Sequence, residues 1–128
     1  MVCSAQNFNG DYRSYKTSFQ DFSSTKNNFI EETEFRIAVL IQENGKDGRV
    51  AIQDPRIPYK LLIYKVTEYI GELENEGIKL FLYKCIPDHL DIPIETILTF
   101  NLNTKNELSL MVYDDDSSQY FFNLKINK

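Results

Sequence analysis

The 128-residue chain has no tryptophan, a single histidine, two cysteines and only three alanines. Long helices usually contain more alanine, so this scarcity disfavours a helical fold. The two cysteines, Cys3 and Cys85, are too few for a disulfide framework, and we expect a terminal thiol and a separate buried thiol. No apolar run approaches the roughly 18 residues that indicate a membrane-spanning helix.

Basic residues are also in the minority. Fourteen lysines and arginines stand against 19 acidic residues, which gives a net charge of −5 and a pI near 4.9. Nucleic-acid binding depends on concentrated positive charge, so this balance argues against a nucleic-acid-binding domain. The apolar content of 42% and the charged content of 26% are ordinary for a globular protein and exclude a wholly disordered chain.

Aromatic residues are abundant, with nine phenylalanines and eight tyrosines, and they favour strands. Eight strands are predicted: one after Gly10, then 35–42, 50–53, 59–73, 78–86, 95–102, 107–113 and 120–126. Segment 59–73 also fits helical spacing, but its β-branched and aromatic content favours a strand. Segment 17–28 is rich in serine and asparagine, and we interpret it as a loop or an irregular strand.

Together these segments predict an all-β fold, an antiparallel meander of about eight strands in a small barrel or barrel-like sandwich, with at most one short helix. Residues 8–128 are expected to form a single β domain, and residues 1–7 a disordered N-terminal remnant. Eight strands enclose an interior that is either filled or holds one small ligand. We expect it to be mostly filled, by Phe35, Tyr69, Phe81, Phe100 and Phe122.

The turn at 74–77 is expected to have four residues, which places Leu73 opposite Ile78 and Glu72 opposite Lys79. Three aspartates, Asp114, Asp115 and Asp116, lack the spacing of a calcium loop, and we interpret them as a polar turn that protects the sheet edge.

The single histidine, His89, lies between Asp88 and Asp91. A histidine oriented by a carboxylate is typical of a general base, whereas a lone histidine in a proline-bounded loop is more often a solvated residue. One histidine and two scattered cysteines do not make a zinc site. Because no phosphate-binding loop, nucleophile elbow or Cys-x-x-Cys is present, we predict no catalytic residues, no metal and no cofactor.

The first seven residues, Met1 to Asn7, contain a short Ser-Ala-Gln stretch. This stretch resembles the cleavage region of signal peptides in secreted Bacteroidetes proteins. The resemblance implies a periplasmic or secreted protein, and a cytoplasmic one if Met1 is the natural start.

The pattern Phe8-x-Gly10-x-Tyr12 resembles the start of the first strand in the calycin barrels, the lipocalins and fatty-acid-binding proteins. That resemblance implies a barrel that carries a small apolar ligand. The chain departs from fatty-acid-binding proteins because it lacks their helix-turn-helix after the first strand and their Arg-x-Tyr clamp in 120–126. Fatty-acid binding is therefore not carried over.

The sequence leaves three functions open. The first is a small secreted or periplasmic bacterial β-domain that acts as a non-enzymatic binding or interaction protein, using an acidic face toward an unknown protein. The second is a calycin-like carrier of a small apolar ligand, and the third is a small hydrolase or isomerase that uses His89. A filled interior with an exposed patch favours the first, and a hollow apolar interior favours the second.

Overall fold

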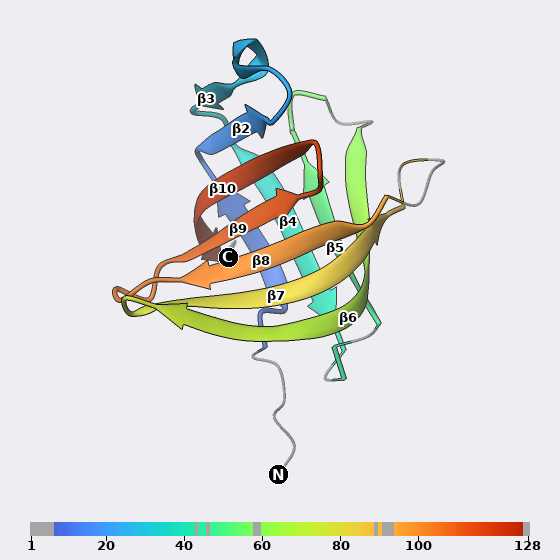
Figure 1. The fold of residues 1–128 in the computed structure, drawn as a ribbon, viewed down its shortest axis with the longest axis vertical. Coiled ribbons are helices and arrows are strands. Elements are labelled where there is room, and N and C mark those ends of the chain that lie inside the picture. Colours follow the sequence, from blue (N-terminus) through green and yellow to red (C-terminus); the bar gives the residue numbers. More distant parts are fainter. Residues whose placement is uncertain are drawn as a thin grey trace.

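The computed structural model describes residues 7–42, 44–45, 47–57, 60–88, 90 and 94–126. Over these residues the elements are β1 (Gly10–Ser14), β2 (Thr17–Asp21), the 3-10 helix η1 (Thr25–Asn27), β3 (Phe29–Glu31), β4 (Phe35–Ile41), β5 (Gly48–Gln53), β6 (Leu61–Asn75), β7 (Ile78–Pro87), β8 (Thr96–Leu102), β9 (Leu108–Tyr113) and β10 (Ser117–Ile126). Figure 1 shows these strands wrapped into one antiparallel sheet, which closes on itself where β1 pairs with β10. The predicted all-β antiparallel fold is confirmed as a closed barrel of eight strands.

Two of the eight barrel strands are interrupted. β1 and β2 run along β10 in one continuous register, with Arg13 opposite Lys125 and Thr17 opposite Phe121. On their other side they pair with β4 and β3, which likewise follow one another along the barrel. Segment 17–28 is therefore mostly regular, with a strand and a 3-10 turn where the sequence predicted a loop or irregular strand.

Residues 17–31, which comprise the β2–β3 hairpin and the 3-10 helix between its strands, are named the β2–β3 flange below. It stands at the top of Figure 1, where it carries the 3-10 helix. The outer strand of the flange, β3, pairs with β2 and with no other strand among the described residues. The flange is therefore the edge of the sheet.

The ambiguous segment 59–73 is a strand, within β6, and not a helix. The predicted register of its hairpin with β7 is wrong by two residues, because Asn75 lies opposite Ile78 and Glu74 opposite Lys79. The turn consists of Glu76 and Gly77 alone, with φ values of 53° and 83°. Positive φ at both central positions is what a two-residue type I′ turn requires. The shift of two residues holds only near the turn, because bulges between Tyr69 and Gly71 and between Val66 and Glu68 reduce it farther along β6.

Inward-facing side chains form a single core, in which Phe35, Phe81 and Phe100 are buried as predicted and Tyr69 packs half-buried against it. The prediction that Phe122 belongs to the core is wrong, because the neighbouring Phe121 is the buried side chain. A bulge separates Phe121 from Leu124 on β10, so alternation counted back from Leu124 selects the wrong residue. Phe122 lies outside, with the Lys16 ammonium 5.0 Å from its ring centroid.

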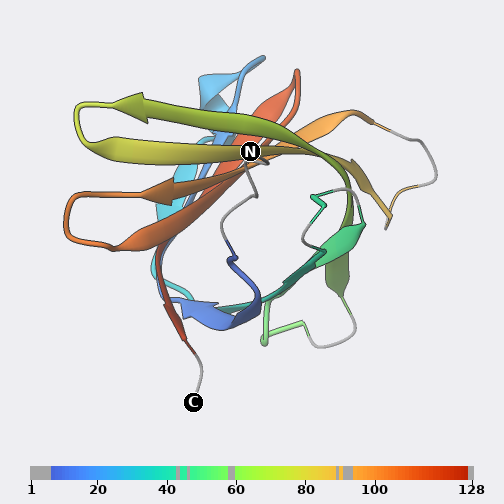
Figure 2. The same ribbon diagram turned by 90° about the horizontal axis from the view of Figure 1, so that it is seen from below.

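Residues 7–9, directly before β1, lie at the end of the barrel that faces the viewer in Figure 2. The Phe8 side chain of this segment is buried, stacks on Phe100 with ring centroids 4.5 Å apart and meets Phe81 edge-on at 5.0 Å. The Tyr12 hydroxyl donates a 2.6 Å hydrogen bond to the Phe8 carbonyl and fixes the segment there. In Phe8-x-Gly10-x-Tyr12, the first and last residues therefore close this end of the barrel.

The predicted N-terminal remnant, apart from Asn7, and His89, the residue on which the hydrolase or isomerase alternative depends, lie outside the described residues.

Candidate binding surfaces on the outside of the barrel

The buried cysteine is not a nucleophile. Cys85 is 1% exposed, and its thiol donates to the Thr96 carbonyl at 3.4 Å. Burial raises the pKa of this thiol to about 12, so it stays protonated at neutral pH. The buried thiol predicted from the sequence is confirmed.

The three aspartates after β9 form a turn. The Asp114 carboxylate accepts hydrogen bonds from the backbone N–H groups of Asp116 and Ser117, at 2.8 and 3.0 Å. This Asx turn links β9 to β10. Across the described part of the chain, no group of three or more His, Cys, Asp or Glu residues is arranged to hold a metal ion. The same residues include no helix long and apolar enough to cross a membrane.

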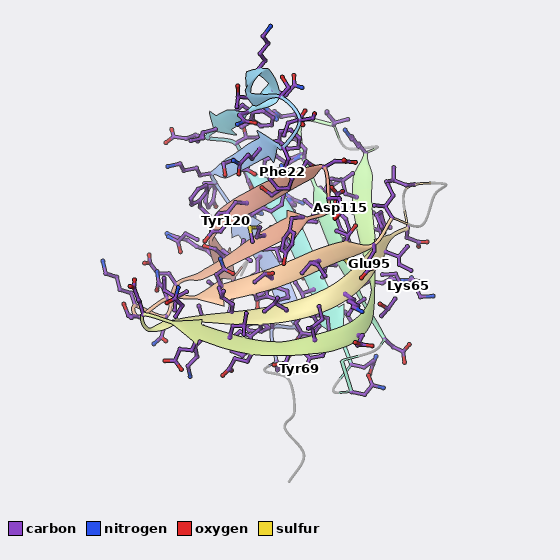
Figure 3. The ribbon with its side chains drawn as sticks, in the orientation of Figure 1. Phe22, Lys65, Tyr69, Glu95, Asp115 and Tyr120 are labelled. Atoms are coloured by element: carbon purple, nitrogen blue, oxygen red, sulfur yellow. The ribbon has the colours of Figure 1, made fainter. Side chains whose placement is uncertain are left out.

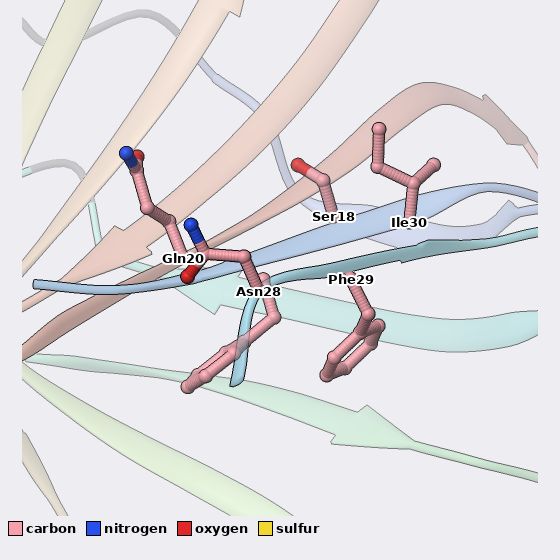
Figure 4. A pocket seen from close by; sticks show the side chains of 6 residues that line it. Ser18, Gln20, Asn28, Phe29 and Ile30 are labelled. Atoms are coloured by element: carbon pink, nitrogen blue, oxygen red, sulfur yellow. The ribbon is translucent and has the colours of Figure 1, made fainter. Parts of the chain in front are cut away.

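The β2–β3 flange carries the first surface hollow, of about 500 Å³. Phe19 and Phe29 face each other across the two strands, and their rings stack with centroids 5.4 Å apart. In Figure 4 Ser18 and Ile30 point to one side of the flange and Phe29 to the other. Ile30 is 67% exposed, so the flange presents apolar groups to solvent at a sheet edge.

A second hollow lies on the outer face of β1, β4, β5 and β6. Alternation along these strands sets Asp11, Ala38 and Ala51 in one row across the sheet. Two depressions of about 280 and 400 Å³ share these three residues. The floor is low because alanine side chains are short, and we name this feature the alanine groove.

Both walls of the alanine groove carry cations. One wall is a row of three cations that lie directly opposite one another on neighbouring strands: Lys125 on β10, Arg13 on β1 and Arg36 on β4. The row on the other side has Arg49 opposite Lys65 across β5 and β6. Side chains in these rows point away from the interior, and Figure 3 shows Lys65 directed away from the barrel.

The outer face of β7 to β10 is different. Its central row, Leu82, Thr99, Met111 and Tyr120, is uncharged. Figure 3 looks onto this side, where Tyr120 is labelled. Glu68, Glu72 and Glu74 are exposed along β6 but do not share one face, since Glu68 lies opposite Lys84 and Glu72 opposite the inward Phe81.

None of these surfaces was identified from the sequence. The signal for the alanine groove is nevertheless present, because Arg36, Ala38 and Leu40 alternate with Ile37 and Val39. A period of two separates an inward from an outward face. The sequence alone does not show that Ala38 and Ala51 become neighbours, because that depends on the β4–β5 register.

No protein-family model, curated protein or solved structure matches the chain. The resemblance of Phe8-x-Gly10-x-Tyr12 to the calycin barrels therefore stays a prediction, and function must be argued from this chain's own residues.

Proposed function

We propose that this protein is a non-enzymatic interaction module that recognises a partner protein through the outside of its barrel. The observation that carries the proposal is the occupied interior. Phe8, Phe81 and Phe100 contact one another where a carrier would need open space for its ligand. Eight strands leave room for side chains or for one small ligand, and here aromatic rings occupy that room.

The outside offers features that suit recognition. The β2–β3 flange and the alanine groove are both hollowed and both lie on strands, and the core packs directly beneath the groove strands β4 and β5. A binding surface built on strands is held more precisely than one built on loops. The protonated, buried Cys85 thiol offers no nucleophile, which favours binding over catalysis.

The proposal is tested by titrating an environment-sensitive apolar dye into the wild type and into Phe8→Ala. We expect no saturable one-to-one binding to the wild type, because Phe8 closes the barrel. Phe8→Ala removes the ring that stacks on Phe100 and should create a cavity that takes up the dye. Such a substitution costs about 3–5 kcal/mol, so circular dichroism must first show that the variant is folded.

If Phe8→Ala does not fold, Phe8→Val removes part of the ring volume with a smaller loss of packing. One-to-one dye binding to the wild type, displaced competitively by a fatty acid, would contradict the proposal and support the carrier alternative.

A further inference from the structure

Like charges stand directly opposite one another on the walls of the alanine groove. Arg13 faces Arg36 across β1 and β4, and Arg49 faces Lys65 across β5 and β6. Such pairs destabilise a sheet, whereas opposite charges stabilise it. On the β6–β7 ladder the barrel follows the favourable rule, since Glu74 faces Lys79. Among the described strand pairs, like charges stand directly opposite one another only on this outer face.

Most of these cations have no ion-pair partner within the described residues, and one carboxylate, that of Asp11, lies in the floor between the two walls. Arg13 alone has an acidic partner there, with its guanidinium 2.9 Å from the Glu34 carboxylate. Arg36, Arg49 and Lys65 are exposed and have no ion-pair partner in the part of the chain that is described. In a chain with a net charge of −5, a face of this kind attracts an acidic partner.

The shape of the groove fits a helix. Arg36 and Leu40 lie four residues apart on β4 and mark the two walls, which sets the walls about 14 Å apart. An α-helix with its side chains is about 10–12 Å across and would contact both walls at once. Leu40 is 63% exposed and Leu61 44% exposed, so the walls also offer apolar contacts. These leucines and the acidic chain as a whole favour a protein over a nucleic acid.

We infer that the alanine groove binds an amphipathic helix of a partner protein, one whose narrow apolar stripe lies on Ala38 and Ala51 and whose acidic flanks face Arg36 and Arg49. This inference rests on the proposed function and names its surface and the chemistry of its partner. The recognition mode is a helix in a groove, with the cations fixing orientation and partner choice.

The test uses two fluorescein-labelled peptides of about 18 residues, long enough to form helix. Both carry the same leucine and alanine stripe, with glutamate on the flanks of one and lysine on the flanks of the other. Fluorescence anisotropy should show that the wild type binds the glutamate peptide and not the lysine peptide. Affinity should fall as salt is raised, because exposed charges are screened.

Arg36→Glu with Arg49→Glu should weaken binding of the glutamate peptide about tenfold or more and create binding of the lysine peptide. The matched control is Lys26→Glu with Lys105→Glu, which makes the same change in net charge in η1 and in the β8–β9 turn and should leave binding unchanged. Both lysines are exposed, so the control variant should fold.

Three results would overturn the inference: no binding of the glutamate peptide by the wild type, equal binding of both peptides, or an equal loss in the control variant. Binding of duplex nucleic acid through the same arginines would also overturn it. The groove and the interior are on opposite sides of the sheet, so peptide and dye report separately. A failed peptide test leaves the interaction module standing, whereas dye binding in the interior contradicts the module whatever the peptides do.

Discussion

The inward and outward residues of β4 and β5 differ in character although only one position separates them. Ile37, Val39, Val50 and Ile52 point inward and are at most 4% exposed. The outward residues of the same strands include two arginines, two alanines and an exposed leucine. The inward residues are similar in size and chemistry because they fill one shared space, and the outward ones are free of that constraint.

The two faces therefore differ in function: the inward side chains stabilise the fold, and the outward side chains are available for recognition. Burial of the inward side chains supplies the free energy that closes the barrel. An outward side chain such as Leu40, which keeps 63% of its surface in water, adds little to it. Recognition can therefore change on the outside with little effect on stability.

The largest expected effect comes from placing a charge on either face. Val39→Asp would bury a carboxylate among apolar side chains, which costs several kcal/mol and should largely unfold a domain of this size. Leu40→Asp makes the same kind of change one residue away on the exposed face, and should alter the free energy of unfolding by about 0.5 kcal/mol or less.

Urea unfolding of both variants against the wild type measures this difference. Similar losses in the two variants would show that the outer face of β4 is packed as tightly as the inner one, and would contradict the division of work between the faces.

The second-largest expected effect is a loss of stability at alkaline pH, caused by ionisable side chains on the inner face. Burial raises the pKa of Tyr83, which is 1% exposed, to about 12, and that of the Cys85 thiol to about 12. The unfolded chain releases these protons near their ordinary values, 10.0 and 9.0. The folded state holds more protons between pH 9 and 12, so stability is retained below this window and falls as pH rises through it.

Each such group contributes at most about 1.4 kcal/mol of lost stability per pH unit within its window. Tyr83→Phe should therefore flatten the decline between pH 10 and 12, measured as the free energy of unfolding in urea at several pH values. An unchanged slope in Tyr83→Phe would show that the inward tyrosine ionises without unfolding.

The sequence predicts which side chains point into the barrel better than it predicts which residues of neighbouring strands pair with each other. Phe35, Phe81 and Phe100 are buried as predicted because alternation in a strand depends only on which residues are apolar. The β6–β7 register failed because the turn places Glu76 at φ 53°, where asparagine or glycine usually marks a type I′ turn. Gly77, at φ 83°, is therefore the one local signal for the shorter loop.

Three further features depend on contacts between distant parts of the chain. The bulge on β10 places Phe121 rather than Phe122 in the core, and its only local mark is Asn123, at φ 47°. The β2–β3 flange is polar enough to be mistaken for a loop, and its strands form because β10 provides a partner. The alanine groove needs the β4–β5 register, which residues 36–51 do not reveal on their own.

The smallest expected change in stability is the sharpest test of the contrast. Ala38→Leu adds a large side chain to the floor of the alanine groove, at an exposed position of β4. Leucine suits a strand at least as well as alanine, so the free energy of unfolding should change by about 0.5 kcal/mol or less. The same side chain fills the groove and should abolish binding of the glutamate peptide, while Ala38→Ser, which keeps the floor low, should bind as the wild type does. Peptide binding that survives in a folded Ala38→Leu variant would place the helix elsewhere on the barrel, and a loss of about 2 kcal/mol in urea unfolding would show that the outer face carries packing after all.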